Sequence, residues 1–573
     1  MTWSSLVLYV VFLGVVAALA RPAGAYMANV FSGRRTWPDI VLGPVERAIY
    51  RIGGIDEKRE MTSGEYGICF LQFSALLAIF IYVILRIQEH LPWFDSAHMT
   101  TPMTHSLAAN TAVSFSSTTT WQAYGGETTM SYLSQMLALT SGSFLAAAAG
   151  LAVGIAFIRG FAREKQTGLG NFWFDLVRAT LWVLVPIALV GSVFLIWQGV
   201  PANLSDYTSA TTVEGGSQTI AQGPIAVLEF IKNLGTNGGG FFNVNGAHPF
   251  ANPTSLTNFV GMLAIAVLPA SLTYTFGRMT GRQREGWLLF GVMALFFSAG
   301  LLISTLAEQG GNHAITQAAN VEESAGGGQP GGNMEGKEVR FGISNSILTS
   351  VTTSNGGTGS FNSMHDAYTP IGNGVALANM LLGEIIFGGL GTGLYGMVMM
   401  VLLTIFLTGL MVGRTPEYLG KRVTPEEIKR IALYVIVFPI VVLGLGGIAV
   451  VTGAGKAGLT LNHGAHGFTE IIFGYASATA NNGLTMASLN ANSNFYNYTM
   501  IVAMIAGRIV LALLALSVAG LFAEQGRRKM SLGTLPTASL QFAIVLSGAI
   551  AIVGGLSFFG ALALGPIIER LLS

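Results

Sequence analysis

Charged residues are scarce in this sequence. Only 10% of the 573 residues are Asp, Glu, Lys or Arg and 51% are hydrophobic, whereas a soluble protein carries about 25% charged residues. A single cysteine, Cys69, excludes an intrachain disulfide framework or a thiolate metal cluster. The net charge of +1 gives no reason to expect nucleic acid or an acidic polymer as a partner. We therefore expect the lipid bilayer to be the main solvent of the chain.

Long apolar runs are plentiful instead. A helix needs about 20 mostly apolar residues to cross a bilayer. The first run resembles a signal peptide, but no basic residue precedes it, so we expect it to be a span. The sequence thus predicts one all-α polytopic membrane domain with ten transmembrane helices. Their expected starts lie near residues 4, 66, 130, 172, 255, 286, 376, 428, 495 and 540.

Lys and Arg are missing from alternate connections between these runs. Residues 89–127 hold none, and residues 199–230 hold none. Because basic residues mark the cytoplasmic side of short loops, the pattern predicts five cytoplasmic connections and both termini outside. Those five connections hold 21 of the 29 Lys and Arg residues and comprise residues 21–65, 159–171, 277–287, 413–430 and 524–534.

Each of four outer connections contains a cluster of Gly, Asn, Thr and Ser. The clusters recur about every 120 residues, and a fixed period indicates internal repetition. An apolar stretch too short to span precedes each cluster, which predicts half-helices at residues 107–115, 225–234, 343–351 and 468–478. The clusters read SSTTTWQAY (116–124), GTNGGGFFN (235–243), TTSNGGTGSFN (352–362) and TANNGLTMASLN (479–490).

This repetition divides the chain into four units of span, half-helix, loop and span. We expect the units to surround a central pore in which the four loops re-enter the membrane and meet. They comprise residues 66–158, 172–277, 286–412 and 428–523. Residues 1–65 form an extra first span and cytoplasmic loop, and residues 540–573 form an extra last span.

The four loops have the composition of a cation filter. Non-helical backbone at membrane depth is tolerated only where protein buries it or where it lines a water-filled path. A dehydrated cation needs oxygen ligands, which rings of backbone carbonyls supply in potassium filters. Glycine and asparagine permit the positive φ angles that let successive carbonyls face one axis. The loops hold no Asp or Glu, which favours a monovalent cation over Ca²⁺ or Mg²⁺; ammonium or rubidium suits this composition as well as potassium.

These loops and their surroundings strongly resemble the KdpA family, the potassium-binding subunits of bacterial high-affinity potassium-transporting P-type ATPases, within the superfamily of potassium transporters. The resemblance covers essentially the whole chain. One departure is the third loop, SNGGTGS, which is richer in glycine than the family pattern. The shared motifs are LGTNGGGFFN (234–243), HPFANPT (248–254), MHD (364–366), GRTPEYLGK (413–421), HGFTEIIF (466–473) and ANNG (480–483).

The resemblance implies K⁺ as the transported ligand, with no organic cofactor. It implies a bacterial inner-membrane complex with a catalytic P-type subunit that uses ATP, an accessory subunit and a small single-span subunit. This chain has neither a DKTGT phosphorylation motif nor a GxxxxGK[ST] loop, so we expect no catalytic residues in it. The implied K⁺ ligands are Thr118, Thr119, Thr120, Thr236, Asn237, Gly238, Gly357, Thr358, Gly359, Asn481, Asn482 and Gly483, with Gln122 just beyond the first set.

The seventh run, residues 376–413, is longer than a span requires. Five glycines lie between Gly388 and Gly396, with Gly389 and Gly391 among them, and they predict a broken helix below the third loop. An irregular segment there would plug the inner side of the pathway and act as a gate. A glycine-rich packing face between helices is the alternative.

Two ionisable residues fall at membrane depth, Glu384 in the seventh run and Arg508 in the ninth. Such groups are costly and are usually paired or face a polar cavity. We expect them to line the route from the filter to the catalytic partner, with Arg508 repelling a cation; a purely structural ion pair, or pairing with backbone groups, is the alternative. We also expect Lys232 to pair with Glu229 or another carboxylate. Among the remaining polar residues, we interpret Asp175 and Arg178 as solvated charges at a helix end, and His248, His365 and Asp366 as braces of the loops.

The residues alone leave a second function open. A stand-alone potassium channel, or a transporter coupled to Na⁺ or H⁺, could use the same four-unit plan. A membrane-embedded enzyme would need converging acid, base or nucleophile groups, and the sequence offers only the isolated charges named above. A partner that hydrolyses ATP is the feature that separates the pump from the channel.

Overall fold

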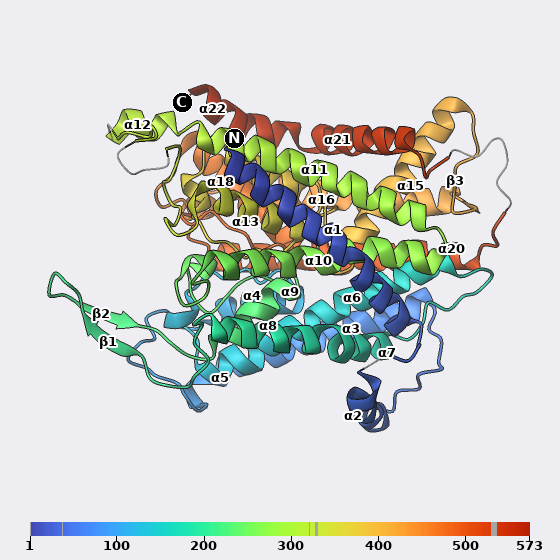
Figure 1. Ribbon diagram of the computed structural model, residues 1–573, viewed down its shortest axis with the longest axis horizontal. Helices are drawn as coiled ribbons and strands as arrows, with labels where there is room; N and C mark the ends of the chain where they lie inside the picture. Colours follow the sequence, from blue (N-terminus) through green and yellow to red (C-terminus); the bar gives the residue numbers. More distant parts are fainter. Residues whose placement is uncertain (1, 37, 320, 327–330, 529–535, 573) are drawn as a thin grey trace.

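The computed structural model describes residues 2–36, 38–319, 321–326, 331–528 and 536–572. Within them, ten helices are long and apolar enough to cross a membrane, and most run along the long axis of the molecule (Figure 1). Four of them contain π-helical turns, and a fifth has a 3-10 end. The spans are α1 (Trp3–Phe31), α3 (Ser63–Ile87) with η1 (Gln88–His90), α5–η3–α6 (Tyr132–Ser134, Gln135–Thr140, Ser141–Ala162), α7–η4–α8 (Phe172–Arg178, Ala179–Leu184, Val185–Trp197), α10 (Ser255–Thr280), α11 (Gln283–Gln309), α15 (Thr392–Val412), α16 (Pro425–Val451), α19–η7–α20 (Asn494–Ile505, Ala506–Val510, Leu511–Glu524) and α21–η8–α22 (Leu540–Leu562, Ala563–Ile567, Ile568–Leu572).

The predicted number of spans is confirmed, but the predicted bounds of the seventh span are wrong. Helix α14 (Pro370–Leu381) ends early, residues 382–391 are not helical, and α15 then begins at Thr392. The break therefore starts before the glycine cluster on which the prediction rested. Gly383, Glu384 and Gly391 have φ angles of +75°, +59° and +95°, which no helix accommodates. Glu384 consequently lies in the break and not in a span.

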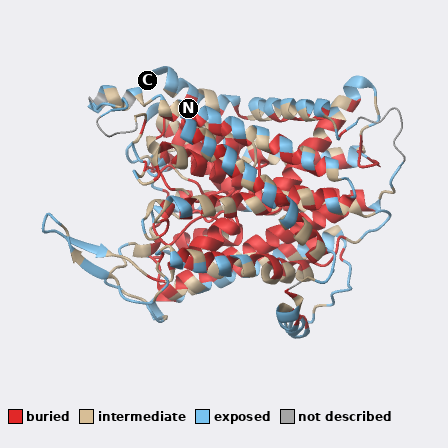
Figure 2. Ribbon diagram, in the orientation of Figure 1, coloured by how far each residue is buried: buried red, intermediate tan, exposed pale blue. Residues whose placement is uncertain are grey.

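Four short helices lie inside the bundle at the positions predicted for the half-helices. The side chain of Thr104 caps the first of them by accepting a hydrogen bond from the backbone nitrogen of Leu107 at 3.2 Å. Most of their residues are buried, as are the inner faces of the long helices around them (Figure 2). These short inner helices are α4 (His105–Ser116), α9 (Ile225–Leu234), α13 (Gly342–Gly356) and α18 (Gly464–Ala480).

The remaining elements lie at the two ends of the bundle. The hairpin β1–β2 lies at the end that also holds both termini, and the hairpin β3–β4 lies at the opposite end with helix α2 (Figure 1). Both termini at one end agree with an even number of spans. The bounds are α2 (Asp39–Gly53), α12 (His313–Ala319), α17 (Gly453–Lys456), η2 (Gly126–Thr128), η5 (Asn245–Ala247), η6 (His365–Ala367), β1 (Thr208–Thr211), β2 (Ser217–Ile220), β3 (Glu417–Tyr418) and β4 (Lys421–Arg422).

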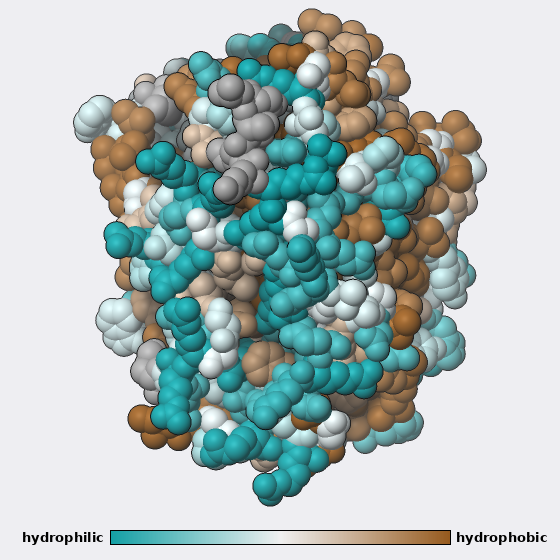
Figure 3. Space-filling model, turned by 90° about the vertical axis from the view of Figure 1, so that its right-hand side faces the viewer, coloured by the Kyte–Doolittle hydropathy of each residue, from teal (hydrophilic) through white to brown (hydrophobic). Residues whose placement is uncertain are grey.

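The end that holds α2 and β3 carries the basic connections of the sequence, as far as the structure describes their residues. Viewed from that end, hydrophilic side chains cover most of the surface and hydrophobic ones gather toward its rim (Figure 3). The flanks of the bundle expose large apolar side chains such as Leu189, Val190 and Leu556. This distribution fits a membrane around the flanks and water at the end.

Buried ion pairs hold this end together, so the interpretation of Asp175 and Arg178 as solvated helix-end charges is wrong. Asp175 is fully buried and accepts hydrogen bonds from both terminal nitrogens of Arg159, at 2.5 and 2.7 Å. Tyr66 donates to the same carboxylate at 3.0 Å. Arg178 donates from Nε to Glu46 at 2.9 Å and thereby ties α2 to the bundle.

Candidate functional site

Four loops meet inside the bundle, one after each short inner helix. We call them loop 1 (residues 118–120), loop 2 (236–238), loop 3 (357–359) and loop 4 (481–483). The third residue of each loop lies against the carbonyl oxygen of the middle residue of the next, and loop 4 meets loop 1 in this way. The four loops therefore form a closed ring. From loop 1 to loop 2, the hydroxyl of Thr120 donates to the carbonyl oxygen of Asn237. In the other three cases the third residue is a glycine, and a Cβ added to it would lie very close to the carbonyl oxygen of the next loop. The distances are 1.5 Å from Gly238 to Thr358, 2.4 Å from Gly359 to Asn482 and 2.2 Å from Gly483 to Thr119.

The backbone conformation repeats in all four loops. The first and third residues of each loop have positive φ angles, from +46° to +90°, and the middle residue does not. Alternation of this kind turns successive N–H groups to one side and leaves successive carbonyls on the other. The middle side chains, those of Thr119, Asn237, Thr358 and Asn482, are fully buried.

One hydrogen bond recurs in the same register in every loop. The backbone nitrogen of the middle residue donates to the carbonyl five residues earlier, in the last turns of the preceding helix. The N–H groups are thus satisfied from behind, and the C-terminal ends of four helices face the ring, where their dipoles favour a cation. The four bonds run from Thr119 to Ser114 (3.0 Å), from Asn237 to Lys232 (2.9 Å), from Thr358 to Thr353 (3.3 Å) and from Asn482 to Ser477 (2.9 Å).

A cavity of about 680 Å³ opens beside the ring, and segments that follow each of the four loops line it. Gln122 is one of the lining residues, and its side chain links the segment after loop 1 to the segment after loop 2. Its Oε1 accepts a hydrogen bond from the backbone nitrogen of Gly240 at 2.9 Å, and its Nε2 donates to the oxygen of the same residue at 3.1 Å. The segments that line the cavity include residues 121–125, 243–244, 361 and 363–365, and 487–492.

Of the three residues expected to brace the loops, His248 stacks on Phe242 after loop 2, His365 lies with Nε2 2.9 Å from the hydroxyl of Ser350 in α13, and Asp366 bonds to the segment after loop 4. Asp366 accepts a hydrogen bond from the backbone nitrogen of Ser488 at 2.8 Å, which ties the segment after loop 3 to the segment after loop 4. His466 lies between Asp366 and Glu569, with Nδ1 2.7 Å from the latter carboxylate. Burial alone would lower the pKa of His466, but its hydrogen bond to Glu569 and the charge of the Asp366 carboxylate, 3.9 Å from Nε2, raise that pKa to about 10. The imidazolium therefore joins the C-terminal helix to the loops.

Glu384 and Arg508 lie close to the ring, on the side opposite the large cavity. A Cβ on Gly357, the first residue of loop 3, would lie 2.4 Å from a carboxylate oxygen of Glu384. Arg508 lies in the π-helical turn η7 and donates to the carbonyl oxygen of Ala146 at 3.0 Å. The second carboxylate oxygen of Glu384 and the Nε of Arg508 are buried without a hydrogen-bond partner. The two groups are not bonded to one another, so the structural ion pair does not form, whereas the bond from Arg508 to the Ala146 carbonyl is the backbone pairing that forms the other part of the alternative.

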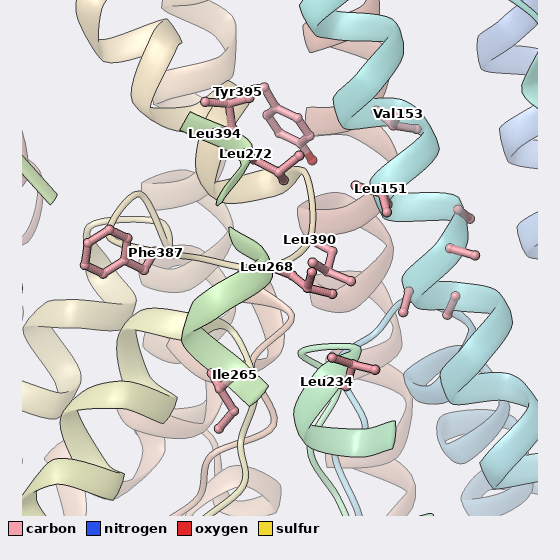
Figure 4. Close-up of a cluster of buried hydrophobic side chains, with 14 of the residues drawn as sticks. Leu151, Val153, Leu234, Ile265, Leu268, Leu272, Phe387, Leu390, Leu394 and Tyr395 are labelled. Carbon is pink, nitrogen blue, oxygen red and sulfur yellow. The ribbon is translucent and has the colours of Figure 1, made fainter. Parts of the chain in front are cut away.

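The helix break passes directly beneath loop 2. The backbone nitrogen of Leu390 donates to the hydroxyl of Thr236 at 3.0 Å. The segment includes Gly389 and Gly391, and its backbone lies close to neighbouring atoms at both glycines. A Cβ on Gly391 would lie only 2.3 Å from the carbonyl oxygen of Gly150 in α6. Figure 4 shows Leu390 beside Leu268 of α10, within an apolar cluster that spans the gap between α10 and α6. The break thus places apolar side chains on the far side of the ring from the large cavity.

The structure brings every residue of the four predicted sets into the ring. Sequence reasoning missed two contributors. One is Asn245, whose amide donates to the oxygen of Gly239 at 2.6 Å. The other is the hydrogen bond between Thr236 and the break. The motif FFNVN that follows loop 2 marks Asn245 as polar among apolar residues, but no local pattern predicts its partner.

Ten apolar spans around a ring of four similar loops define a multi-pass helical membrane protein with a central polar site. A family model described as KdpA, potassium-transporting ATPase A subunit, matches residues 10–571. The chain belongs to the KdpA family.

Several relatives match the chain over nearly its full length. A protein of Methylobacterium radiotolerans is 48% identical and the match covers 99% of this chain and 97% of the relative. A protein of Solibacter usitatus is 47% identical, with 100% and 99% covered. One of Rhodospirillum centenum is 48% identical, with 100% and 98% covered. Each of the three is named potassium-transporting ATPase potassium-binding subunit.

Proposed function

We propose that this chain is the potassium-binding and potassium-translocating subunit of an ATP-driven, high-affinity potassium uptake complex. The closed ring of four loops is the observation that carries the proposal. In every loop the N–H group of the middle residue is bonded behind the ring. The loop carbonyls, among which that of Asn237 also accepts the Thr120 hydroxyl, face an ion in the arrangement that replaces the hydration shell of K⁺. The names of the relatives support potassium as the ion and an ATPase as the assembly.

The ion is held by the loops and passes inward past the helix break. The ligands are the residues of loops 1 to 4, with Gln122 fixing the outer mouth. Glu384 and Arg508 line the route below the ring, where their unpartnered atoms can face a passing ion or water. The break at Gly389 and Gly391 blocks the straight path, because its backbone packs against α6 without space for a side chain.

The proposal also fixes the orientation and the partners. The basic connections at the α2 end support a cytoplasmic location for that end, with the chain in a bacterial inner membrane. Both termini and the large cavity are then extracytoplasmic. Four units of span, short inner helix, loop and span surround the ring at residues 66–158, 172–277, 286–412 and 428–523. ATP is hydrolysed by a P-type catalytic subunit, and an accessory subunit and a small single-span subunit complete the complex.

Potassium-stimulated ATP hydrolysis by the purified complex tests this function. We expect K⁺, and not Na⁺, to stimulate hydrolysis, and we expect liposomes that contain the complex to take up K⁺ only with ATP. Purification of the chain alone as a passive potassium conductor, with no ATPase bound, would refute the pump and favour the stand-alone channel.

A further inference from the structure

A buried lysine stands directly behind loop 2. Lys232 lies in the last turn of α9, and its side chain is completely buried. Its Nζ lies 2.7 Å from a carboxylate oxygen of Glu229 and donates to Oδ1 of Asn245 at 2.5 Å. A buried charge is tolerated where it is paired and hydrogen-bonded, and both conditions are met here.

This lysine is bonded to the loop from two sides. Its backbone oxygen accepts hydrogen bonds from the nitrogens of Asn237 and Gly238, at 2.9 and 3.0 Å. Its ammonium holds Asn245, and the amide of Asn245 donates to the oxygen of Gly239 at 2.6 Å. The Gly239 carbonyl follows loop 2 directly and is occupied by this bond. The ammonium thereby sets where the outer end of loop 2 lies.

The ammonium is also a positive charge next to the proposed cation path. A Cβ on Gly240 would lie only 3.2 Å from Nζ of Lys232. An unpaired charge at this depth would repel a cation strongly, because the protein interior screens poorly. Glu229 cancels that field. Glu229 also borders a small cavity of about 20 Å³ that Asn233 lines as well, which is large enough for one water molecule that can solvate the carboxylate.

We propose that the Lys232–Glu229 pair is a specificity-determining element of the ion site. The ammonium holds the outer end of loop 2 through Asn245 at the spacing that distinguishes K⁺ from Na⁺. Glu229 cancels the field that the ammonium would otherwise impose on the bound ion. This inference rests on the proposed function and assigns the pair a task that the loops alone do not perform.

A double-mutant cycle in the intact complex separates the two roles. K⁺ and Na⁺ titrations of ATP hydrolysis give the affinity and the discrimination for each variant. We expect Glu229→Gln to weaken the apparent affinity for K⁺ by about ten-fold or more, since it leaves the ammonium unpaired. We expect Lys232→Met to lower the K⁺ over Na⁺ discrimination by about ten-fold. The double variant should recover the K⁺ affinity lost in Glu229→Gln but keep the poor discrimination.

Two further variants distinguish a specific effect on the ion site from a general loss of stability. Asn245→Ala removes the contact to the filter backbone and keeps the ion pair, so we expect lost discrimination with nearly unchanged K⁺ affinity. Lys421→Met removes another fully buried lysine, which donates to the oxygens of Gly160 and Phe522 at the opposite end. This control should lower thermal stability and leave discrimination unchanged.

Several results would overturn the inference. Additive effects of the single substitutions on K⁺ affinity would show that Glu229 does not cancel the lysine charge. Unchanged discrimination in Lys232→Met, or in Asn245→Ala if the lysine variants do not assemble, would reduce the pair to a packing role. Absence of K⁺ stimulation in the unmodified complex would instead refute the proposed function.

Discussion

Adding one methyl group to a ring glycine should damage ion binding far more than it damages the fold. Gly238 has a φ angle of +81°, and a Cβ there would lie 1.5 Å from the carbonyl oxygen of Thr358. Real Cβ contacts shorter than 3.0 Å are essentially never observed, so this oxygen must move by roughly 1.5 Å. A displacement of about 1 Å in a positioned group costs on the order of 100-fold. We therefore expect Gly238→Ala to weaken half-maximal K⁺ stimulation by about 100-fold, or about 3 kcal/mol.

A graded set of glycine variants distinguishes this cause from backbone strain. Gly281, at the end of α10, has a similar φ angle of +72° and no atom within 4 Å of its missing Cβ. Alanine there pays only the left-handed strain of about 1 kcal/mol. The expected order of K⁺ affinity loss follows the distances to the neighbouring oxygens, with Gly238 above Gly483 (2.2 Å), Gly359 (2.4 Å) and Gly281 last. An equal loss in Gly281→Ala, or wild-type affinity in Gly238→Ala, would refute the ring geometry.

Three further substitutions test contacts around the ring. Thr236→Val keeps the shape of the side chain but removes the hydroxyl that accepts the hydrogen bond from the Leu390 nitrogen. We expect about 1–3 kcal/mol of lost stability and a passive K⁺ leak through the complex in liposomes. Liposomes that do not leak K⁺ would contradict a role of this hydrogen bond in closing the path. Folding raises the pKa of His466 to about 10, so its stabilisation is complete below pH 6.5 and is lost as the pH rises through about 10. His466→Gln should therefore lower the melting temperature at pH 6 and not at pH 10.5, and a pH-independent deficit would exclude the charge as the cause. Asp175→Asn leaves the buried Arg159 unpaired and should cost about 3–5 kcal/mol in thermal unfolding of the complex without altering K⁺ discrimination.

The sequence indicated the ring because its conformation demands particular residues. Loops 3 and 4 use Gly357, Gly359, Asn481 and Gly483 at positive φ angles, and these residue types are visible in any sequence. The common period then places the four loops at equivalent points in the fold. Threonines at positive φ in loop 1, by contrast, have no such signature. Their conformation is imposed by the bonds back to α4 and by the neighbouring loops.

The positions of the break and of the buried pairs could not be predicted from local patterns. Gly393 and Gly396 belong to the glycine cluster of the seventh run, but they lie inside α15, where they allow close packing against the break and Tyr434. Asp175 in α7 pairs with Arg159 in the preceding helix α6, and only the tertiary packing excludes water from both side chains. Composition shows that a charge is present, but whether it is solvated depends on neighbours that are distant in the sequence.

Direct location of the bound ion tests the central claim most sharply. We propose determining the structure of the purified complex in K⁺ and in Rb⁺, whose greater electron density identifies the ion. The account predicts Rb⁺ on the axis of the ring, surrounded by carbonyl oxygens from Thr119, Asn237, Thr358 and Asn482. Rb⁺ bound elsewhere in the chain, with the ring unoccupied at saturating concentration, would contradict it.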